Sequence, residues 1–355
     1  MTSATSSRLS SGRDVRLTEW TSCGGCAAKW AGTALSRLVG ELGVPGGPGG
    51  PGGEGPDELL VGLAPFDDAA VYRLSSELAL VSTTDFFPPL VDDPDDFGAI
   101  AAANACSDVF AMGARVVLAV NIAAFPEDLP EEAAAEIIAA AAAVVREAGG
   151  VVAGGHTIRS EEPIFGLAVQ GLVHPEAVLT KIGSRPGDAV LLSKPLGTGI
   201  CLAGGSAESK AAAIAGMRAL NRASSETLVG LRPAVHALTD VTGFGLLGHA
   251  SEMAQGSGVG IVFSGSKLPF YEGALEAAAA GVRTGGDSRN RRYVSGLGDV
   301  RSEVAEEIEA LCFDPQTSGG LLCAVKPEVS EELEAAGFFH VGTVVRDRKP
   351  VALEP

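Results

Sequence analysis

Aspartates embedded in apolar sequence are the feature that most constrains how this chain folds. Asp67 and Asp68 precede one apolar run, Asp85 follows another, and Asp108 stands among Val, Phe and Met residues. An ionised carboxylate buried without a partner is costly. Carboxylates in one cleft also repel one another unless a cation lies among them. A few carboxylate oxygens suit Mg²⁺, because they leave coordination positions on the ion free for the oxygens of a phosphate. These residues therefore predict a site for Mg²⁺ and a nucleotide.

The segments around these aspartates are predicted to bring them together. Residues 78–81 are typical of a buried strand, which places Asp85 where that strand ends. A helix is predicted from residue 97 to 112, and in a helix Asn104 and Asp108 share one face. By contrast, residues 92–96 combine aspartates with a proline, which is typical of a solvated turn, and we exclude them from the site.

The composition predicts a two-domain protein that recognises a small molecule. The 355 residues are 46% hydrophobic, enough for a large core. The net charge of −18 disfavours binding to nucleic acid or to an anionic membrane, since both need clustered Lys and Arg. Residues 1–16 lack the apolar core of a targeting segment, and the Ala-rich stretch near Ala139 is too short to span a bilayer. We therefore expect a cytoplasmic protein.

The six cysteines divide into two groups. They are too sparse for the disulfide framework of a secreted domain, so reduced thiols are expected. Four lie in apolar surroundings and are predicted to be small core residues: Cys106, Cys201, Cys312 and Cys323. Cys23 and Cys26 instead lie in a Gly-containing segment, where the cation of Lys29 favours a thiolate. The Gly/Pro-rich residues 43–56 predict a flexible tether, which is either the hinge of a catalytic flap or a neutral spacer.

The first half of the chain alternates predicted strands and helices. Strands are predicted at 69–74, 116–122 and 163–173, and a helix from Pro130 to Gly149. A polar connector at 174–187 is interpreted as a domain boundary. The predicted organisation is a flexible segment at 1–58, an ATP- and Mg²⁺-binding domain at 59–174 and an α+β domain at 187–355.

A glycine pair interrupts another predicted strand at 151–153. The strand is expected to break at four residues: Gly154, Gly155, His156 and Thr157. Backbone amides in such a turn can approach a phosphate. The alternative is a glycine turn beside a core histidine.

The second half repeats the alternation. A strand is predicted at 189–192, a turn at 196–199, and helices around Met217 and at 228–237. The pattern Gly243-x-Gly245-x-x-Gly248 has the spacing of a dinucleotide fingerprint, but no acidic residue follows at the end of a second strand, so this interpretation is disfavoured. Asp240 instead adds a carboxylate to the metal cluster from the second domain. Residues 312–322 predict a turn before a strand, with structural polar side chains.

Together these segments resemble the selenophosphate synthetase (selenide, water dikinase) family over nearly the whole chain. The resemblance is specific because many motifs occur in order. They are Arg16-Leu17-Thr18, Cys26-x-x-Lys29, Asp67-Asp68-Ala69-Ala70-Val71-Tyr72, Ser82-Thr83-Thr84-Asp85-Phe86-Phe87, Asn104-Ala105-x-Ser107-Asp108, Gly154-Gly155-His156, residues 163–169 and 240–249, and Asp314-Pro315-Gln316-Thr317-Ser318-Gly319-Gly320.

The resemblance implies an enzyme that converts ATP, selenide and water to selenophosphate, AMP and orthophosphate. It implies Mg²⁺ ligands at Asp68, Asp108 and Asp240. Nucleotide contacts are implied at Lys29, Asp67, Asp85, Asp108, Gly154, Gly155, His156 and Thr157. Cys26 and Lys29 occupy the family's catalytic positions, where a thiolate is suited to guiding selenium.

The resemblance also implies the architecture and the partners. The expected fold is a two-domain α+β fold like that of aminoimidazole ribonucleotide synthetase, in which the N-terminal domains of two copies form a β-barrel. The expected partners are selenide, ATP, a second copy of the chain and a selenium-delivery protein.

The sequence departs from the family at the catalytic segment. Ala27 and Ala28 stand where a glycine and a second thiol are common, and the other cysteine is displaced to Cys23. A redox pair of Cys23 with Cys26 is therefore one alternative function. A nucleotide-binding selenium carrier without turnover is another. Two relatives on the same fold, thiamine-monophosphate kinase and a hydrogenase-maturation dehydratase, are further alternatives, which Cys26-x-x-Lys29 disfavours.

Overall fold

The computed structural model describes residues 7–8, 14–21, 24–25, 56–63, 67–346 and 351–355. The predictions for Cys23, Cys26, Lys29 and residues 43–55 of the Gly/Pro-rich tether lie outside the described residues. None of the helices in the described part of the chain combines the length and hydrophobicity needed to cross a lipid bilayer.

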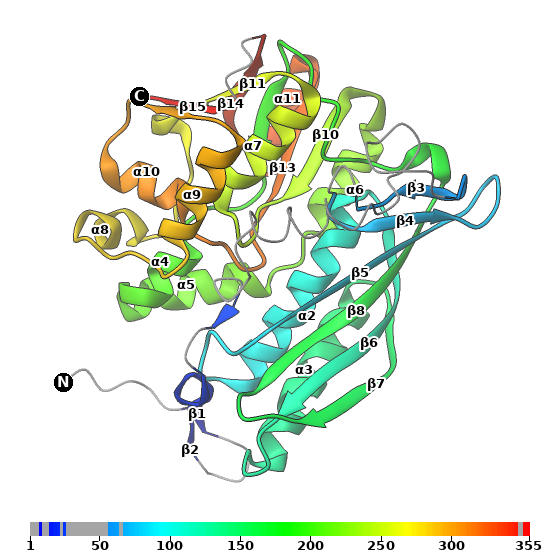
Figure 1. Cartoon of the computed structure of the whole chain (residues 1–355), viewed down its shortest axis with the longest axis vertical. Coiled ribbons are helices and arrows are strands. Elements are labelled where there is room, and N and C mark those ends of the chain that lie inside the picture. Colours follow the sequence, from blue (N-terminus) through cyan, green and yellow to red (C-terminus); the bar gives the residue numbers. More distant parts are fainter. Residues whose placement is uncertain (1–6, 9–13, 22–23, 26–55, 64–66, 347–350) are drawn as a thin grey trace.

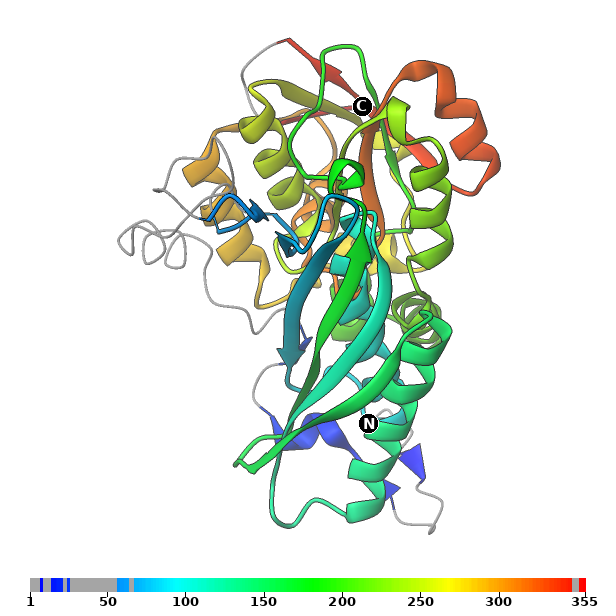
Figure 2. The ribbon, with the colours of Figure 1, turned by 90° about the vertical axis from the view of Figure 1, so that its right-hand side faces the viewer.

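Within its described residues, the first half of the chain forms a six-stranded sheet with two helices on one face (Figures 1 and 2). Neighbouring strands are antiparallel except β6 and β7, which are parallel. In spatial order the strands are β3 (Leu59–Val61), β4 (Ala70–Arg73), β5 (Ala79–Phe87), β8 (Ile164–Val173), β6 (Arg115–Phe125) and β7 (Val151–Arg159). The helices are α2 (Pro94–Ala111) and α3 (Glu131–Glu147). In both views no described element lies over the other face of the sheet.

Helix α2 is buried on nearly every side, because it packs between the sheet, α3 and the second domain. Its run of small residues permits this close packing. The helix begins at Pro94, earlier than the predicted residue 97, so the prediction of a turn at 92–96 was wrong at its C-terminal end. The Asp93 side chain accepts the N–H of Asp96 at 3.0 Å and caps the helix, and Pro94 suits the first helical position because its missing N–H costs nothing there.

Two further local predictions in this domain are corrected. Asp85 lies inside β5 and not at its end, because the pairing with β8 continues to Phe87. Strand β7 does not break at Gly154 and Gly155 but continues to Arg159. Its pairing with β6 instead shifts register between Ala119 and Asn121. A Cβ on Gly155 would lie 2.5 Å from the Asn121 carbonyl oxygen, so glycine permits the irregular pairing of an unbroken strand.

In the second half, residues 174–346 and 351–355 form a seven-stranded mixed sheet and eight α-helices. In spatial order the strands are β10 (Val235–Asp240), β13 (Leu321–Val325), β9 (Ala189–Leu192), β14 (Phe339–Val345), β11 (Gly260–Ser264), β15 (Val351–Glu354) and β12 (Val300–Ser302). The helices are α4 (Thr198–Gly204), α5 (Ala207–Arg218), α6 (Arg222–Gly230), α7 (Gly245–Ser257), α8 (Ala274–Ala279), α9 (Asp287–Leu297), α10 (Glu306–Phe313) and α11 (Ser330–Ala335).

The predicted helix at 228–237 was wrong beyond Gly230. Helix α6 ends at Gly230, a short 3₁₀ turn containing Pro233 follows, and residues from Val235 onward form β10. Periodicity does not distinguish a short apolar run in a strand from one in a helix, and pairing with β13 decides the outcome here. The predicted turn at 196–199 is also partly corrected, because α4 begins at Thr198.

Each sheet has its own core, and the four predicted core cysteines are confirmed as buried thiols. The described part of the N-terminal segment also joins the first core. Leu17, in a 3₁₀ turn at Leu17–Trp20, is fully buried, and the Thr18 N–H bonds Asp92 Oδ1 at 3.2 Å. This contact anchors the N-terminal segment beside the start of α2.

Candidate active site

Four aspartates from different elements gather where the two domains meet. Asp68 precedes β4, Asp85 lies in β5, Asp108 lies in α2, and Asp240 ends β10. Burial raises the pKa of Asp108 well above its ordinary value, and the charges of Asp240, Asp85 and Asp68 raise it further. Charges act on a pKa in this way only from nearby, so these carboxylates lie near one another.

Hydrogen bonds fix the orientation of the cluster. Thr83 Oγ1 donates to Asp108 Oδ2 at 2.6 Å, and Asn104 Nδ2 donates to Asp85. Asn104 and Asp108 therefore use one face of α2, as their spacing predicted. Among the described residues, the neutral donors Thr83 and Asn104 thus orient the carboxylates of Asp108 and Asp85.

Asp67 lies beside the cluster, and its carboxylate accepts hydrogen bonds from two backbone N–H groups. Its Oδ1 accepts the N–H of Asp68 at 2.9 Å, and its Oδ2 accepts the N–H of Lys181 at 3.0 Å. Burial raises the pKa of Asp67 to about 7, and the charge of Asp68 contributes. Asp67 thus holds the turn before β4 against the connection between the domains.

Lys181 is a cation of the site that our sequence reasoning missed. Its Nζ lies 3.1 Å from Asp68 Oδ1 and 3.1 Å from Glu252 Oε2 on α7. Burial alone would lower the pKa of Lys181, but these two carboxylates raise it well above its ordinary value. The signal was a single lysine between Thr180 and Ile182, in a segment that we interpreted only as a polar connector.

The segment 314–320 joins the two domains behind the cluster. Gln316 Oε1 accepts the N–H groups of Gly197 and Thr198, at 3.0 and 3.1 Å. The Ser318 N–H donates to Asn104 Oδ1 on α2 at 2.7 Å. Lys194 Nζ donates to the Ser318 carbonyl at 2.9 Å. These contacts give the Gln316 side chain and the Ser318 backbone structural roles.

The oxygen donors of the cluster suit a divalent cation by their chemistry. Asp68 Oδ2 is buried and has no hydrogen-bond partner among the described residues. A buried carboxylate oxygen in this state is costly, and a cation held there would offset that cost. Oxygen donors are also the ligands that Mg²⁺ prefers. A second acidic group, formed by Asp93, Asp95 and Asp96 at the start of α2, differs because Arg218 forms ion pairs with two of its carboxylates.

The residues Gly154 to Thr157 do not meet the aspartates within one chain. Asp85 on β5 pairs with Leu167 on β8, Leu167 with Asn121 on β6, and Asn121 with Gly155 on β7. Neighbouring strands lie about 4.8 Å apart, so Gly155 is roughly 14 Å from Asp85 along this row. The His156 side chain is exposed.

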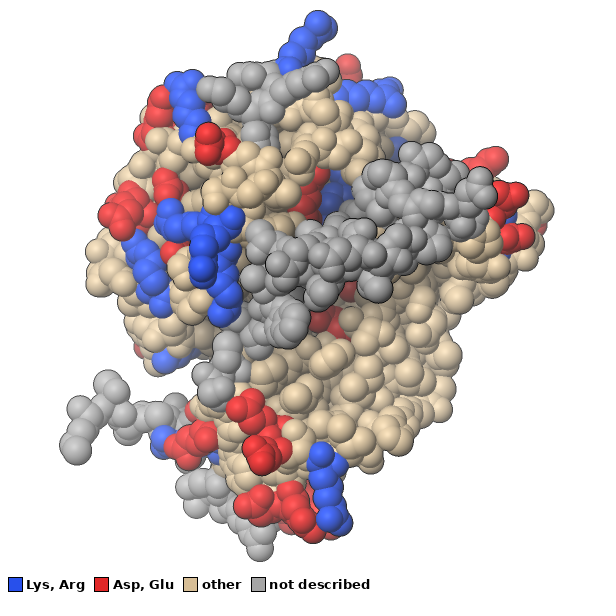
Figure 3. All heavy atoms as spheres, in the orientation of Figure 1, with Lys and Arg blue, Asp and Glu red and all other residues tan. Residues whose placement is uncertain are grey.

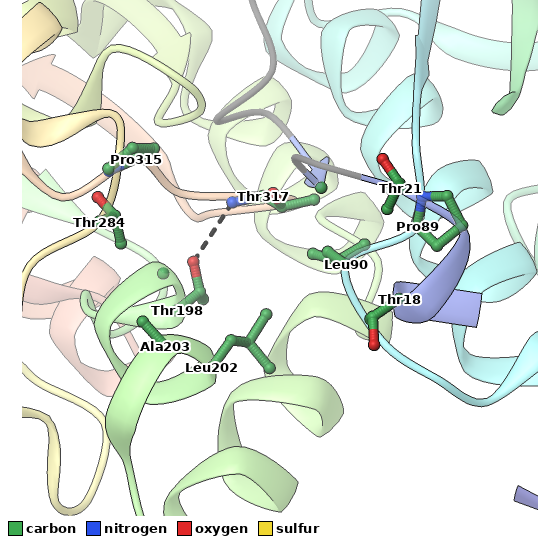
Figure 4. Close-up of a pocket in the computed structure, with 12 residues that line it drawn as sticks. Thr18, Thr21, Pro89, Leu90, Thr198, Leu202, Ala203, Thr284, Pro315 and Thr317 are labelled. Atoms are coloured by element: carbon green, nitrogen blue, oxygen red, sulfur yellow. Dashed lines mark hydrogen bonds between the residues drawn. The ribbon is translucent and has the colours of Figure 1, made fainter. Parts of the chain in front are cut away.

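A cavity of about 330 Å³ lies between the N-terminal segment and the second domain (Figure 4). Thr18, Pro89 and Leu90 line one side, and Thr198 and Thr317, joined by a 3.3 Å hydrogen bond from the Thr317 N–H to Thr198 Oγ1, line the other. Gly24 lies at its edge, and a Cβ on Gly24 would lie 2.1 Å from the Pro89 carbonyl oxygen. The next residue, Gly25, donates its N–H to the Pro88 carbonyl at 2.9 Å. The chain is thus anchored at the cavity immediately before Cys26.

The carboxylate pKa values predict how stability depends on pH without metal. Burial raises the pKa of Asp67 and of Asp314 to about 7, from an ordinary 3.8. Between about pH 4 and 7 the folded chain therefore binds more protons than the unfolded chain, and its free energy of unfolding falls as the pH rises. Burial lowers the pKa of Lys194 from 10.5 to about 7, so this residue changes the pH dependence of stability only above pH 7.

In EDTA we expect the melting temperature to fall from pH 5.5 to pH 7.5. Mg²⁺ with a non-hydrolysable ATP analogue should reduce this fall, because the cation would replace protons on Asp68 and Asp108, whose pKa values burial also raises. A melting temperature that rises across this window in EDTA would contradict the buried-carboxylate account.

Two family models match the chain, one over most residues of each sheet. The family described as AIR synthase related protein, N-terminal domain, matches residues 66–173, and its C-terminal domain matches residues 185–353. Solved structures agree on the fold. Thiamine monophosphate kinase from Aquifex aeolicus aligns with a TM-score of 0.62 at 21% identity, covering 82% of this chain and 92% of that one. The hydrogenase maturation protein HypE in complex with ATP aligns at 0.57 and 20% identity, covering 81% and 84%. The fold and site thus define a two-domain α+β protein of the AIR-synthase-related class.

Comparison with curated proteins narrows this class. The selenide, water dikinase of Caldanaerobacter subterraneus subsp. tengcongensis is 45% identical over 342 residues, covering 93% of this chain and 96% of the relative. That of Myxococcus xanthus is 43% identical, covering 91% and 92%. The chain belongs to the selenide, water dikinase family.

Proposed function

We propose that the chain transfers phosphate from ATP to selenide, which yields selenophosphate, AMP and orthophosphate with consumption of one water. The observation that carries the proposal is the whole-length similarity to selenide, water dikinases together with the shared carboxylate site between the domains. The product is a selenium donor for selenoprotein and selenonucleoside synthesis.

The most direct test of this activity is phosphorus NMR of ATP and Mg²⁺ with the protein, with and without selenide. We expect a selenophosphate signal, AMP and orthophosphate only when selenide is present. ADP as the sole nucleotide product, or turnover that does not depend on selenide, would overturn the proposal.

We assign Asp68, Asp108 and Asp240 as the residues that hold Mg²⁺. Bound there, Mg²⁺ neutralises the charge of the triphosphate, whose two anhydride bonds are broken. Asp85 and Asp67 belong to the nucleotide side of the cluster, where Asp67 fixes the turn that carries Asp68. Thr83 and Asn104 hold Asp108 and Asp85 in position before substrate binds. The two domains of 59–174 and 187–355 together complete this site.

We assign the selenium chemistry to Cys26 and the neutralisation of phosphate charge near the transferred group to Lys29. A thiolate is a soft nucleophile suited to guiding selenide, and a lysine cation stabilises phosphate oxygens. The support from the described residues is the anchoring of Gly24 and Gly25 on Pro88 and Pro89, next to a cavity between the domains.

We further propose a cytoplasmic homodimer in which the N-terminal sheets of two copies face each other as a β-barrel. The outer face of the sheet carries apolar side chains that lie outside the core, and Phe86 and Ile158 are 51% and 58% exposed. Figure 3 shows the surface over β5, β8, β6 and β7 as a broad area without charged residues. An apolar face of this kind marks a protein interface. The second copy would bring its Gly154, Gly155, His156 and Thr157 to the nucleotide.

Ile158→Asp is expected to convert the dimer to a monomer and to weaken ATP binding. In a two-fold symmetric dimer the same apolar face of each copy forms the interface, so the substitution places two charges in it. Light scattering coupled to size exclusion measures the mass. Leu275→Asp is the matched control, because Leu275 is a 38% exposed apolar residue on α8 of the second domain. A dimeric Ile158→Asp variant would exclude this face as the interface.

A further inference from the structure

Lys181 joins both domains at the acidic cluster. It lies in the connection between β8 and β9, with its side chain only 5% exposed. Its Nζ contacts Asp68 Oδ1 of the first domain and Glu252 Oε2 of the second, each at 3.1 Å. Its N–H also donates to Asp67 at 3.0 Å. Side chain and backbone of one residue therefore fix both aspartates of the turn before β4.

The two oxygens of Asp68 have different surroundings. Oδ1 accepts hydrogen bonds from Lys181 Nζ and from Thr239 Oγ1, at 3.1 and 2.9 Å. Oδ2 is equally buried, yet none of the described residues forms a hydrogen bond with it. With two donors on one oxygen, the carboxylate has a single orientation, and its other oxygen is left for a cation.

Glu252 holds Lys181 from the opposite side. Its Oε2 lies 3.1 Å from Lys181 Nζ, and its Oε1 accepts the hydroxyl of Tyr293 at 2.5 Å. The ring Nδ1 of His249 lies 3.8 Å from Glu252 Oε2. Because α7 and α9 fix this carboxylate, the ammonium group of Lys181 is held at one distance from Asp68.

We propose that Lys181 is a positioning residue for the metal. It keeps Asp68 turned so that Oδ2 is presented to Mg²⁺, and Glu252 keeps Lys181 in place. This inference rests on the proposed metal site of Asp68, Asp108 and Asp240. It adds a residue that fixes the orientation of the Asp68 carboxylate through its Oδ1 atom.

The test is a charge-matched double variant, Lys181→Met with Glu252→Gln. Lys181→Met alone would leave two buried carboxylates without a cation, which is strongly destabilising. The double variant removes one positive and one negative charge, so the net charge of the cluster stays that of the wild type. A change in Mg²⁺ affinity then reports the orientation of Asp68 and not the total charge.

We expect the double variant to need at least about tenfold more Mg²⁺ for half-maximal binding of a non-hydrolysable ATP analogue, since loss of such supporting contacts commonly costs 10- to 100-fold in metal affinity. Glu252→Gln alone should shift the Mg²⁺ requirement far less, because Lys181 still contacts Asp68. Tyr293→Phe, which removes one hydroxyl from Glu252, should match the wild type. Thermal melts in EDTA establish that each variant is folded.

Thr239→Val tests the same orientation through the second donor to Asp68 Oδ1 and leaves both ion pairs intact. It should raise the Mg²⁺ requirement in the same direction. A folded double variant with the Mg²⁺ requirement of the wild type would overturn the role of Lys181. A wild type whose binding of the analogue does not depend on Mg²⁺ would instead overturn the metal site itself.

Discussion

Asp108→Asn is expected to lower the rate of selenophosphate formation by about a thousand-fold, because it removes charge that holds the metal at the triphosphate. Asparagine keeps the shape of the side chain and an oxygen that can accept the hydrogen bond from Thr83. Stability should not fall. Burial and the neighbouring carboxylates raise the pKa of Asp108, so a neutral side chain at this position removes repulsion from the metal-free protein. In EDTA the variant should melt at the same temperature as the wild type or higher.

The matched control is Asp95→Asn in the first turn of the same helix. Asp95 is an exposed carboxylate paired with Arg218 at 2.7 Å, and exposed ion pairs contribute little to stability. This variant should keep wild-type turnover. If Asp108→Asn kept more than about a tenth of the wild-type rate, a role of Asp108 in binding the metal would be excluded.

Cys26→Ser is expected to abolish selenide-dependent formation of selenophosphate while Mg²⁺-dependent nucleotide binding stays that of the wild type. A serine hydroxyl is almost never ionised near neutral pH, whereas a thiol is a ready source of the soft anion. The nucleotide site rests on carboxylates of the described domains, so it should not be affected. Phosphorus NMR and calorimetry measure the two properties on the same sample.

Cys23→Ser is the matched control for this thiol. It should retain activity if Cys26 reacts alone. Equal loss of activity in both variants, restored by neither reductant nor selenide, would favour a redox pair and contradict the assignment of Cys26 as the single reacting thiol.

Short-range patterns in the sequence were sufficient for several elements of the site. The spacing of Asn104 and Asp108 predicted that both lie on one face of α2, and the structure confirms it. The four core cysteines followed from their apolar neighbours. These predictions succeeded because each depends on a few adjacent residues and the period of one helix.

Other features depend on pairing between distant segments, which periodicity does not contain. Whether residues 235–240 form a helix or a strand is decided by pairing with β13, and the continuity of β7 through Gly155 is decided by its neighbour β6. The contact of Lys181 with both Asp68 and Glu252 joins three segments far apart in sequence. A lone lysine in a connector gave no pattern from which to predict it.

The separation of Gly154 to Thr157 from the aspartates has a similar origin. The family resemblance placed both at the nucleotide, and the strand register separates them within one chain. The proposed second copy reconciles the family resemblance with the strand register, because β7 of one chain would face the aspartate cluster of the other.

We propose above that buried carboxylates from two domains form a Mg²⁺-dependent site for ATP. Isothermal titration calorimetry of the full-length protein with a non-hydrolysable ATP analogue, in Mg²⁺ and in EDTA, tests it most directly. We predict binding in Mg²⁺ that is lost in EDTA and in Asp108→Asn. Equal affinity for the analogue in Mg²⁺ and in EDTA would contradict the account.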